Sequence, residues 1–89
     1  MFILTIEGKE KEGAYAVADK GGGQILYLFE EEDDADRYAM MLEDEGYPDM
    51  NVVEVEEELI IKTCRIHGHE YAIITKNDIV IPPEKHDFI

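Results

Sequence analysis

The 89-residue chain contains no serine, no tryptophan and a single cysteine, Cys64. One cysteine excludes an internal disulfide and favours a reducing compartment over secretion. No apolar run reaches the roughly 20 residues that a helix needs to cross a bilayer, and the first residues lack the basic region of a signal peptide. We therefore expect a soluble cytoplasmic protein, monomeric or homodimeric, with one domain spanning residues 1–89.

Basic residues are also scarce, because 8 Lys and Arg face 22 Asp and Glu and give a formal net charge of −14. Such a charge repels phosphate groups, which argues against direct binding of nucleic acid or of an anionic membrane. The hydrophobic fraction is 45%, enough to form a core. The composition favours a basic or mixed-charge protein partner.

Residues 29–48 are the most informative segment, because they combine a helical pattern with signals for both helix ends. Acidic residues precede and enter the first turn, where unpaired N–H groups favour negative charge. Gly46 suits a left-handed helix end, and Pro48 prevents continuation. Apolar residues at helical spacing predict one stripe facing a sheet: Ala35, Tyr38, Ala39, Met41 and Leu42.

Short β-prone runs flank this helix at residues 2–6, 14–19, 24–29, 51–55, 71–75 and, as an edge strand, 79–81. The second and third runs are joined by a glycine-containing loop and predict an antiparallel hairpin. Residues 84–89 are expected to be loosely held. A second helix is predicted to end at Gly68, with this buried stripe: Leu59, Ile60, Thr63, Cys64 and His67.

Two helices with one apolar stripe each, and a sheet with one buried face, close a core as a two-layer sandwich. The sequence therefore predicts an α+β fold with a mainly antiparallel sheet of about four to six strands. Both helices are expected on one face, which is ferredoxin-like in general architecture.

Three stretches make the chain resemble a family from cyanobacteria and chloroplasts called domain of unknown function 3110. The first is Leu28-Phe29, an acidic cap, Asp33-Asp34-Ala35-x-Arg37-Tyr38-Ala39-x-x-Leu42-Glu43 and then Tyr47-Pro48. The second is Cys64-Arg65, Gly68 and the strand at 71–74; the third is Val80-Ile81-Pro82-Pro83-Glu84. A serine-type cap is expected where Glu31 stands. The resemblance implies no known reaction, but it implies a cyanobacterium, a plastid stroma or a virus of cyanobacteria as the setting.

Cys64, His67 and His69 form the one cluster with metal-ligand residue types, and a fourth ligand would have to come from His86 or a carboxylate. Zinc needs three or four converging ligands, and the chain has no second Cys/His pair at ligand spacing. A buried cysteine and a helix-end histidine explain the same residues. We predict no metal, no cofactor and no catalytic residue, because no nucleophile has an evident base beside it.

Two further features have ordinary structural explanations. The triplet at residues 21–23 precedes a strand, whereas a phosphate loop precedes a helix, so a hairpin loop is the better interpretation. The acidic run favours a solvated helix cap over a calcium loop, which would need spaced ligands around a glycine. Its candidate partner-facing residues are Glu30, Glu31, Glu32, Asp33, Asp34 and Asp36.

Three functions remain open at this point. The first is a non-catalytic protein-binding or regulatory module that recruits a basic partner through its acidic face, where negative charge is concentrated at residues 30–36, 43–45 and 54–58. The second is a dimeric domain that senses a small ligand in a cleft between sheet and helices. The third is an acidic mimic of nucleic acid, of viral origin.

Overall fold

The computed structural model describes residues 1–9, 13–18, 21, 23–78 and, for the backbone alone, 86–88. The predicted edge strand at 79–81 lies outside these residues. Helices and strands follow one another in the order β1 (Phe2–Ile6), β2 (Tyr15–Ala18), β3 (Gln24–Phe29), α1 (Glu32–Asp44), β4 (Met50–Glu54), α2 (Glu57–His67), β5 (Glu70–Ile74) and β6 (His86–Phe88).

The strands form one sheet. Successive pairs follow the order β4-β1-β3-β2-β6, and β5 pairs with β3 outside this path. The hairpin of β2 and β3 is antiparallel, as predicted, and so are the pairs β1–β3, β1–β4 and β2–β6. Strand β5 is parallel to β3. The α+β class, the mainly antiparallel sheet and the two helices are confirmed.

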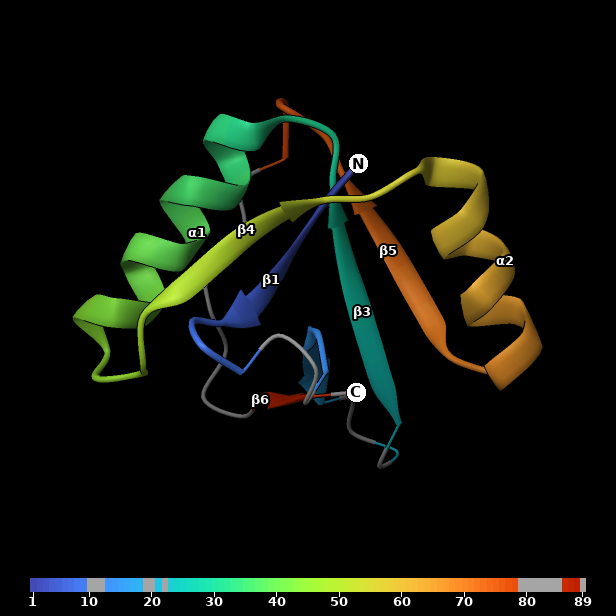
Figure 1. Ribbon diagram of the computed structural model, residues 1–89, viewed down its shortest axis with the longest axis horizontal. Helices are drawn as coiled ribbons and strands as arrows, with labels where there is room; N and C mark the ends of the chain where they lie inside the picture. Colours follow the sequence, from blue (N-terminus) through green and yellow to red (C-terminus); the bar gives the residue numbers. More distant parts are fainter. Residues whose placement is uncertain (10–12, 19–20, 22, 79–85, 89) are drawn as a thin grey trace.

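The expectation that both helices cover one face of the sheet, as in ferredoxin-like folds, is wrong. Figure 1 shows α1 and α2 on opposite sides of the strands. Neighbouring residues of a strand therefore enter different cores: Leu4 packs with α1 and Ile3 with α2. Tyr27 and Leu28 divide in the same way.

The order of the parallel strands explains this arrangement. The connection from β3 through α1 to β4 runs one way across the sheet, whereas the connection from β4 through α2 to β5 runs back past β1 and β3. Crossovers between parallel strands are right-handed in nearly all proteins. Two crossovers of the same hand that run in opposite directions place their helices on opposite faces.

Helix α1 matches the sequence-based prediction closely. Its buried residues are Ala35, Tyr38, Ala39 and Leu42, and Met41 is half-buried. Gly46 has φ +92°, the left-handed conformation that glycine adopts without strain. Glu31 is the N-cap and makes no side-chain cap hydrogen bond, in keeping with the departure from a serine-type cap.

Aromatic rings fill the α1 side of the sheet. The ring of Tyr38 meets those of Tyr15, Phe29 and Tyr27 with centroids 5.4, 5.5 and 5.8 Å apart. The hydroxyls of Tyr15 and Tyr38 share a buried hydrogen bond of 2.8 Å. Burial raises the pKa of Tyr15 to about 12 and raises that of Tyr38 as well. These tyrosines are core residues.

Helix α2 packs less deeply, and part of its predicted stripe is wrong. Cys64 is its one buried residue, while Leu59 is 61% exposed and Thr63 and His67 are also exposed. Ile60, as predicted, and Ile61, which the stripe did not include, pack toward the sheet. Gly68 ends the helix in the left-handed conformation, as predicted.

The C-terminal segment differs from expectation too. Residues 86–88 form β6, which pairs with β2 through Tyr15↔Phe88, Ala16↔Asp87 and Val17↔His86. The prediction that residues 84–89 are loosely held is therefore wrong for these three, because a long-range ladder holds their backbone.

Candidate functional site

The acidic run that the sequence singles out surrounds the start of α1. Its members Glu30, Glu31, Glu32, Asp33 and Asp36 are exposed. Asp34 differs, because its side chain is only 13% exposed and its Oδ1 accepts a hydrogen bond of 3.0 Å from Arg37. We therefore exclude Asp34 from the partner-facing set and retain the other five as candidates.

The exposed carboxylates divide between two sides of α1. Glu31 and Asp33 share one side with two cations, Arg37 and Lys76, which offset their charge. Glu32 and Asp36 lie on the side that faces β4, together with Glu43, which is about two turns beyond Asp36. We call Glu32, Asp36 and Glu43 the α1 acidic flank; it is the side of the helix without a neighbouring cation among the described residues.

A groove of about 560 Å³ runs between this flank and β4. Its apolar part includes Ala39 and Val52, and Met40, whose side chain is 61% exposed. The remaining contributors are Met50 and Asn51. The groove thus combines carboxylates on one wall with apolar side chains beside a strand, which suits an extended segment bearing both basic and apolar residues.

Negative charge is concentrated where α1 ends. Glu43 lies beside Asp49, and a hydrogen bond between the two carboxyl groups, followed by the charge of Asp49, raises the pKa of Glu43. Asp44 and Glu7 add to this effect. A helix C-terminus carries partial negative charge and favours cations, yet the last turn of α1 contains no basic residue.

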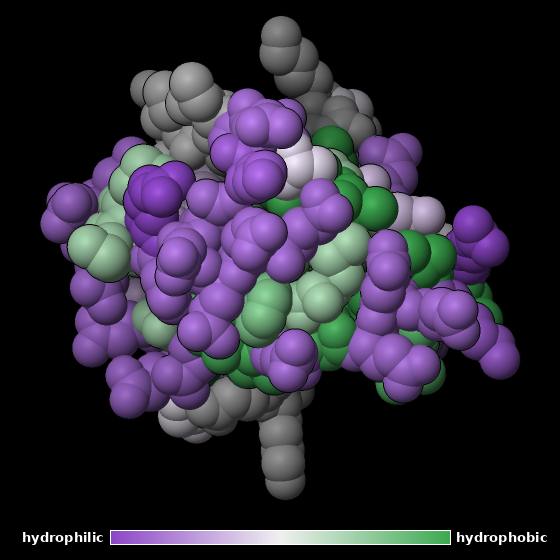
Figure 2. Space-filling view, turned by 90° about the horizontal axis from the view of Figure 1, so that it is seen from above, coloured by the Kyte–Doolittle hydropathy of each residue, from purple (hydrophilic) through white to green (hydrophobic). Residues whose placement is uncertain are grey.

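Figure 2 shows how polar and apolar surface are distributed at the end of the molecule where both helices begin. Polar side chains cover the two flanks, and apolar surface lies between them.

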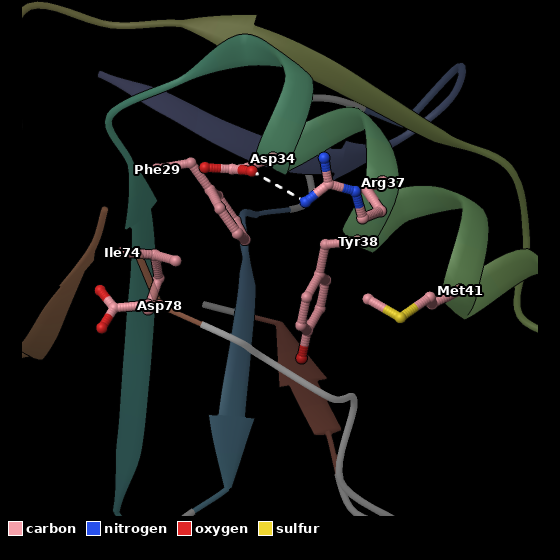
Figure 3. A pocket seen from close by; sticks show the side chains of 7 residues that line it. All are labelled: Phe29, Asp34, Arg37, Tyr38, Met41, Ile74 and Asp78. Carbon is pink, nitrogen blue, oxygen red and sulfur yellow. Dashed lines mark hydrogen bonds and ion pairs between the residues drawn. The ribbon is translucent and has the colours of Figure 1, made fainter. Parts of the chain in front are cut away.

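A second candidate site lies between α1 and the ends of β3 and β5, and it is too small for a ligand. Figure 3 shows the ion pair of Asp34 and Arg37 beside the ring of Phe29, with Asp78 across from it. Asp78 Oδ2 accepts hydrogen bonds from the Thr75 N–H and hydroxyl. The cavity measures about 20 Å³, room for about one water molecule.

The cysteine and histidine cluster does not assemble into a metal site among the described residues. Cys64 is 2% exposed, and burial raises the pKa of its thiol. The rings of His67 and His69 are tilted by 32° with centroids 6.0 Å apart, and the side chain of His86 is outside the described residues. Cys64, His67 and His69 line an open hollow of about 290 Å³. The other lining residues are Ala14, Leu26, Ile60 and Thr63.

The glycine triplet lies in the connection between β2 and β3, whose antiparallel pairing places it at a hairpin end, as the sequence indicated. It precedes a strand and not a helix. Among the described residues, no helix has both the length and the apolar character that a bilayer crossing needs.

Comparison with protein families gives one result that bears on identity. The sequence profile of the family described as Domain of unknown function (DUF3110) matches residues 1–84. The chain belongs to this family. The match covers all three stretches that carry the resemblance, and DUF3110 implies no reaction or ligand. Searches of curated proteins and of solved structures gave no significant match.

Sequence reasoning counted Glu43 among the acidic residues, but it did not place Glu43, Met40 or Val52 beside the acidic run in one groove. Glu43 is seven residues beyond Asp36 and eleven beyond Glu32, and only the helical period links the three. Met40 does not belong to the buried stripe, and the helical period therefore predicts that its apolar side chain is exposed. The spacing of Glu43 and the exposure of Met40 could be predicted from the sequence, but the position of Val52 beside them depends on the fold.

Proposed function

We propose that this domain is a non-catalytic protein-binding or regulatory module that recruits a basic segment of a partner protein through the α1 acidic flank. The observation that carries the proposal is the groove beside that flank, lined by Glu32, Asp36 and Glu43 and by no cation among the described residues. The resemblance suggests a cyanobacterial cell or a plastid stroma as its setting.

The charge of α1 is not explained by the stability of the helix. Acidic residues in its first turn stabilise it, but Glu43 and Asp44 oppose the partial negative charge at its C-terminus. Sequences depart from such local preferences most often at functional positions. A basic partner offsets the repulsion between Glu43 and Asp49. Binding therefore removes an unfavourable interaction that is present in the free protein.

The net charge of −14 also limits the partner class. Phosphate groups are repelled, whereas a basic protein segment is attracted and its association is accelerated. We therefore propose neither direct nucleic-acid binding nor attachment to an anionic membrane.

A peptide of alternating lysine and valine, about eight residues long, is a suitable probe because it supplies positive charge and apolar side chains in extended form. Its affinity is measured by fluorescence anisotropy at low and at physiological salt. We expect tighter binding at low salt, since exposed charges are screened within about 8 Å at physiological ionic strength.

A matched pair of triple variants locates the binding surface. E32Q/D36N/E43Q neutralises the α1 acidic flank, whereas E56Q/E57Q/E58Q removes the same number of charges at the start of α2. We expect the first variant to weaken binding about tenfold or more and the second by about twofold. Equal losses in both variants would show that net charge alone attracts the peptide, and salt-independent binding would contradict the proposal.

The hollow beside Cys64 favours a second candidate function, sensing of a small apolar ligand. Its volume of about 290 Å³ approaches that of small ligand sites, and apolar side chains from β3 and α2 line it. A metabolite that fits there should raise the melting temperature of the protein but not of the L26W variant, in which the larger side chain enters the hollow.

A further inference from the structure

Strand β4 is an edge of the sheet. It pairs with β1 in a continuous antiparallel register from Phe2↔Glu54 to Ile6↔Met50. Among the described residues, no strand pairs with its other edge. An edge strand presents backbone N–H and C=O groups that can pair with another chain.

The ladder shows which backbone groups of β4 face outward. The N–H of Glu7 donates to the C=O of Asp49 at 3.0 Å, and the N–H of Val55 donates to the C=O of Met1 at 2.8 Å. Hydrogen-bonded residues alternate along an antiparallel strand, so Asn51 and Val53 also face β1. Met50, Val52 and Glu54 consequently direct their N–H and C=O groups away from the sheet.

The outward edge of β4 and the α1 acidic flank enclose the same groove. A strand added to β4 would lie about 4.8 Å from it and would run beneath the flank. Glu32 and Asp36 are one turn apart, about 6 Å along the helix. Alternate side chains of a strand are spaced by about 6.7 Å, so lysines two residues apart match this spacing.

We propose that the partner's basic segment binds by strand addition: it pairs with Met50, Val52 and Glu54 and points alternate basic side chains at the α1 acidic flank. This proposal rests on the proposed function and specifies how the segment is held. Backbone pairing supplies affinity in this mode, and the side chains of alternate residues supply specificity.

A second copy of this chain is a poorer occupant of the same edge. Two molecules that each carry a net charge of −14 repel each other. Pairing β4 with β4 would also bring two copies of the α1 acidic flank together without any cation between them. A basic segment removes this repulsion, and therefore charge complementarity selects a partner protein.

Proline substitution tests the backbone contribution directly. Glu54→Pro removes an outward N–H but no bond to β1, and proline is tolerated on edge strands in this orientation. Glu54→Gln removes only the charge. Ile73→Pro makes the matching change on β5, at the opposite edge of the sheet. The C=O of Ile74 accepts from the N–H of Glu30, so the backbone N–H and C=O of the preceding residue, Ile73, face away from β3.

We expect Glu54→Pro to weaken binding of the lysine–valine peptide about fivefold or more. Glu54→Gln and Ile73→Pro should change it by about twofold or less. Circular dichroism establishes that each variant is folded. A second measurement leaves the protein unaltered: methylation of alternate peptide nitrogens on the pairing edge should abolish binding, whereas methylation on the other edge should not.

The outcomes separate the two proposals. Binding that depends on salt and on the α1 acidic flank, but tolerates Glu54→Pro and both methylated peptides, would overturn strand addition and keep the proposed function. No salt-dependent binding at all would overturn both. A dimer whose formation is lost in Glu54→Pro without any peptide would overturn the choice of a partner protein and identify a second copy as the occupant.

Discussion

The two helices of this domain differ in both burial and charge. Helix α1 buries four residues, including Tyr38 and Leu42, while α2 buries Cys64 alone. Both begin with acidic residues, which suits their N-termini. Helix α2 ends with Arg65 and His67, which suits its C-terminus, whereas the last turn of α1 contains no basic residue.

This difference indicates which charges have a structural explanation. The charges of α2 follow the helix dipole and stabilise the helix that carries them. The acidic residues at the end of α1 oppose the dipole, and the firm packing of that helix against the aromatic core holds them in place despite the cost. A rigid surface of uncompensated charge binds a partner without a large ordering cost.

The largest predicted effect separates the two helices by burial. Leu42→Ala should lower the free energy of unfolding by about 2–5 kcal/mol, because it empties a fully buried position. Leu59→Ala, a matched change on α2, should alter it by about 0.5 kcal/mol or less, since that side chain is 61% exposed. Urea unfolding measures both; equal losses would contradict the assignment of the main core to α1.

The buried tyrosine pair should give the next largest effect. Tyr15→Phe removes a hydrogen bond of 2.8 Å to the buried hydroxyl of Tyr38 and should cost about 1–3 kcal/mol. The double variant with Tyr38→Phe should cost less than the sum of the single variants, because it removes both polar groups. Tyr71→Phe, on the α2 side, is the control and should have a smaller effect.

The same pair predicts sensitivity to alkaline pH. Burial raises the pKa of Tyr15 from 10.0 to about 12 in the folded protein. A raised folded-state pKa means that the protonated hydroxyl contributes stability, which is complete below about pH 10 and is lost as the pH rises to about 12. Unfolding of the Tyr15→Phe variant should depend less on pH over that interval; an unchanged dependence would refute this.

Substitutions that change the charge in the last turn of each helix should have smaller effects on stability, and these effects should have opposite signs in α1 and α2. Asp44→Lys places a cation in the last turn of α1 and should stabilise the protein by about 0.3–1 kcal/mol. Arg65→Gln removes a cation from the last turn of α2 and should destabilise the protein by a similar amount, about 0.3–1 kcal/mol. Thermal unfolding at low salt checks both, and high salt should reduce each difference.

The smallest effect concerns Glu43. Its pKa is raised mainly by the hydrogen bond to Asp49 and by the charge of that residue. Deprotonation therefore costs more in the folded state, so Glu43→Gln should raise the melting temperature slightly at neutral pH. The gain should disappear in acid, where Glu43 is protonated; a gain that persists there would contradict the repulsion between Glu43 and Asp49.

Local signals predicted the elements but not their arrangement. Helix α1 was predictable because its periodic apolar residues agree with Gly46 and Pro48 at its end. Helix α2 is shorter and has apolar residues on several sides, so the predicted stripe joined Leu59 and His67, which are exposed, to Ile60 and Cys64, which pack on the sheet. Docking on the sheet decides between them, and that contact is not local.

The same reason explains the other differences. The pairing of β5 with β3, and of β6 with β2, joins residues that are far apart in sequence, and these pairings determine the faces that the helices cover. The candidate site was half predictable. The acidic run was evident, but the groove depends on β4 being an edge, and a strand pattern does not show which strands lie at an edge.

Amide hydrogen exchange along the whole chain, with and without the lysine–valine peptide, tests the central claim that a basic segment binds at the α1 side. Our account predicts slower exchange at Met50, Val52 and Glu54, whose amides lie on the outward edge of β4, and little change in α2 and β5. Slower exchange in α2 or β5 without any change in β4, or no change anywhere when the peptide is bound, would contradict it.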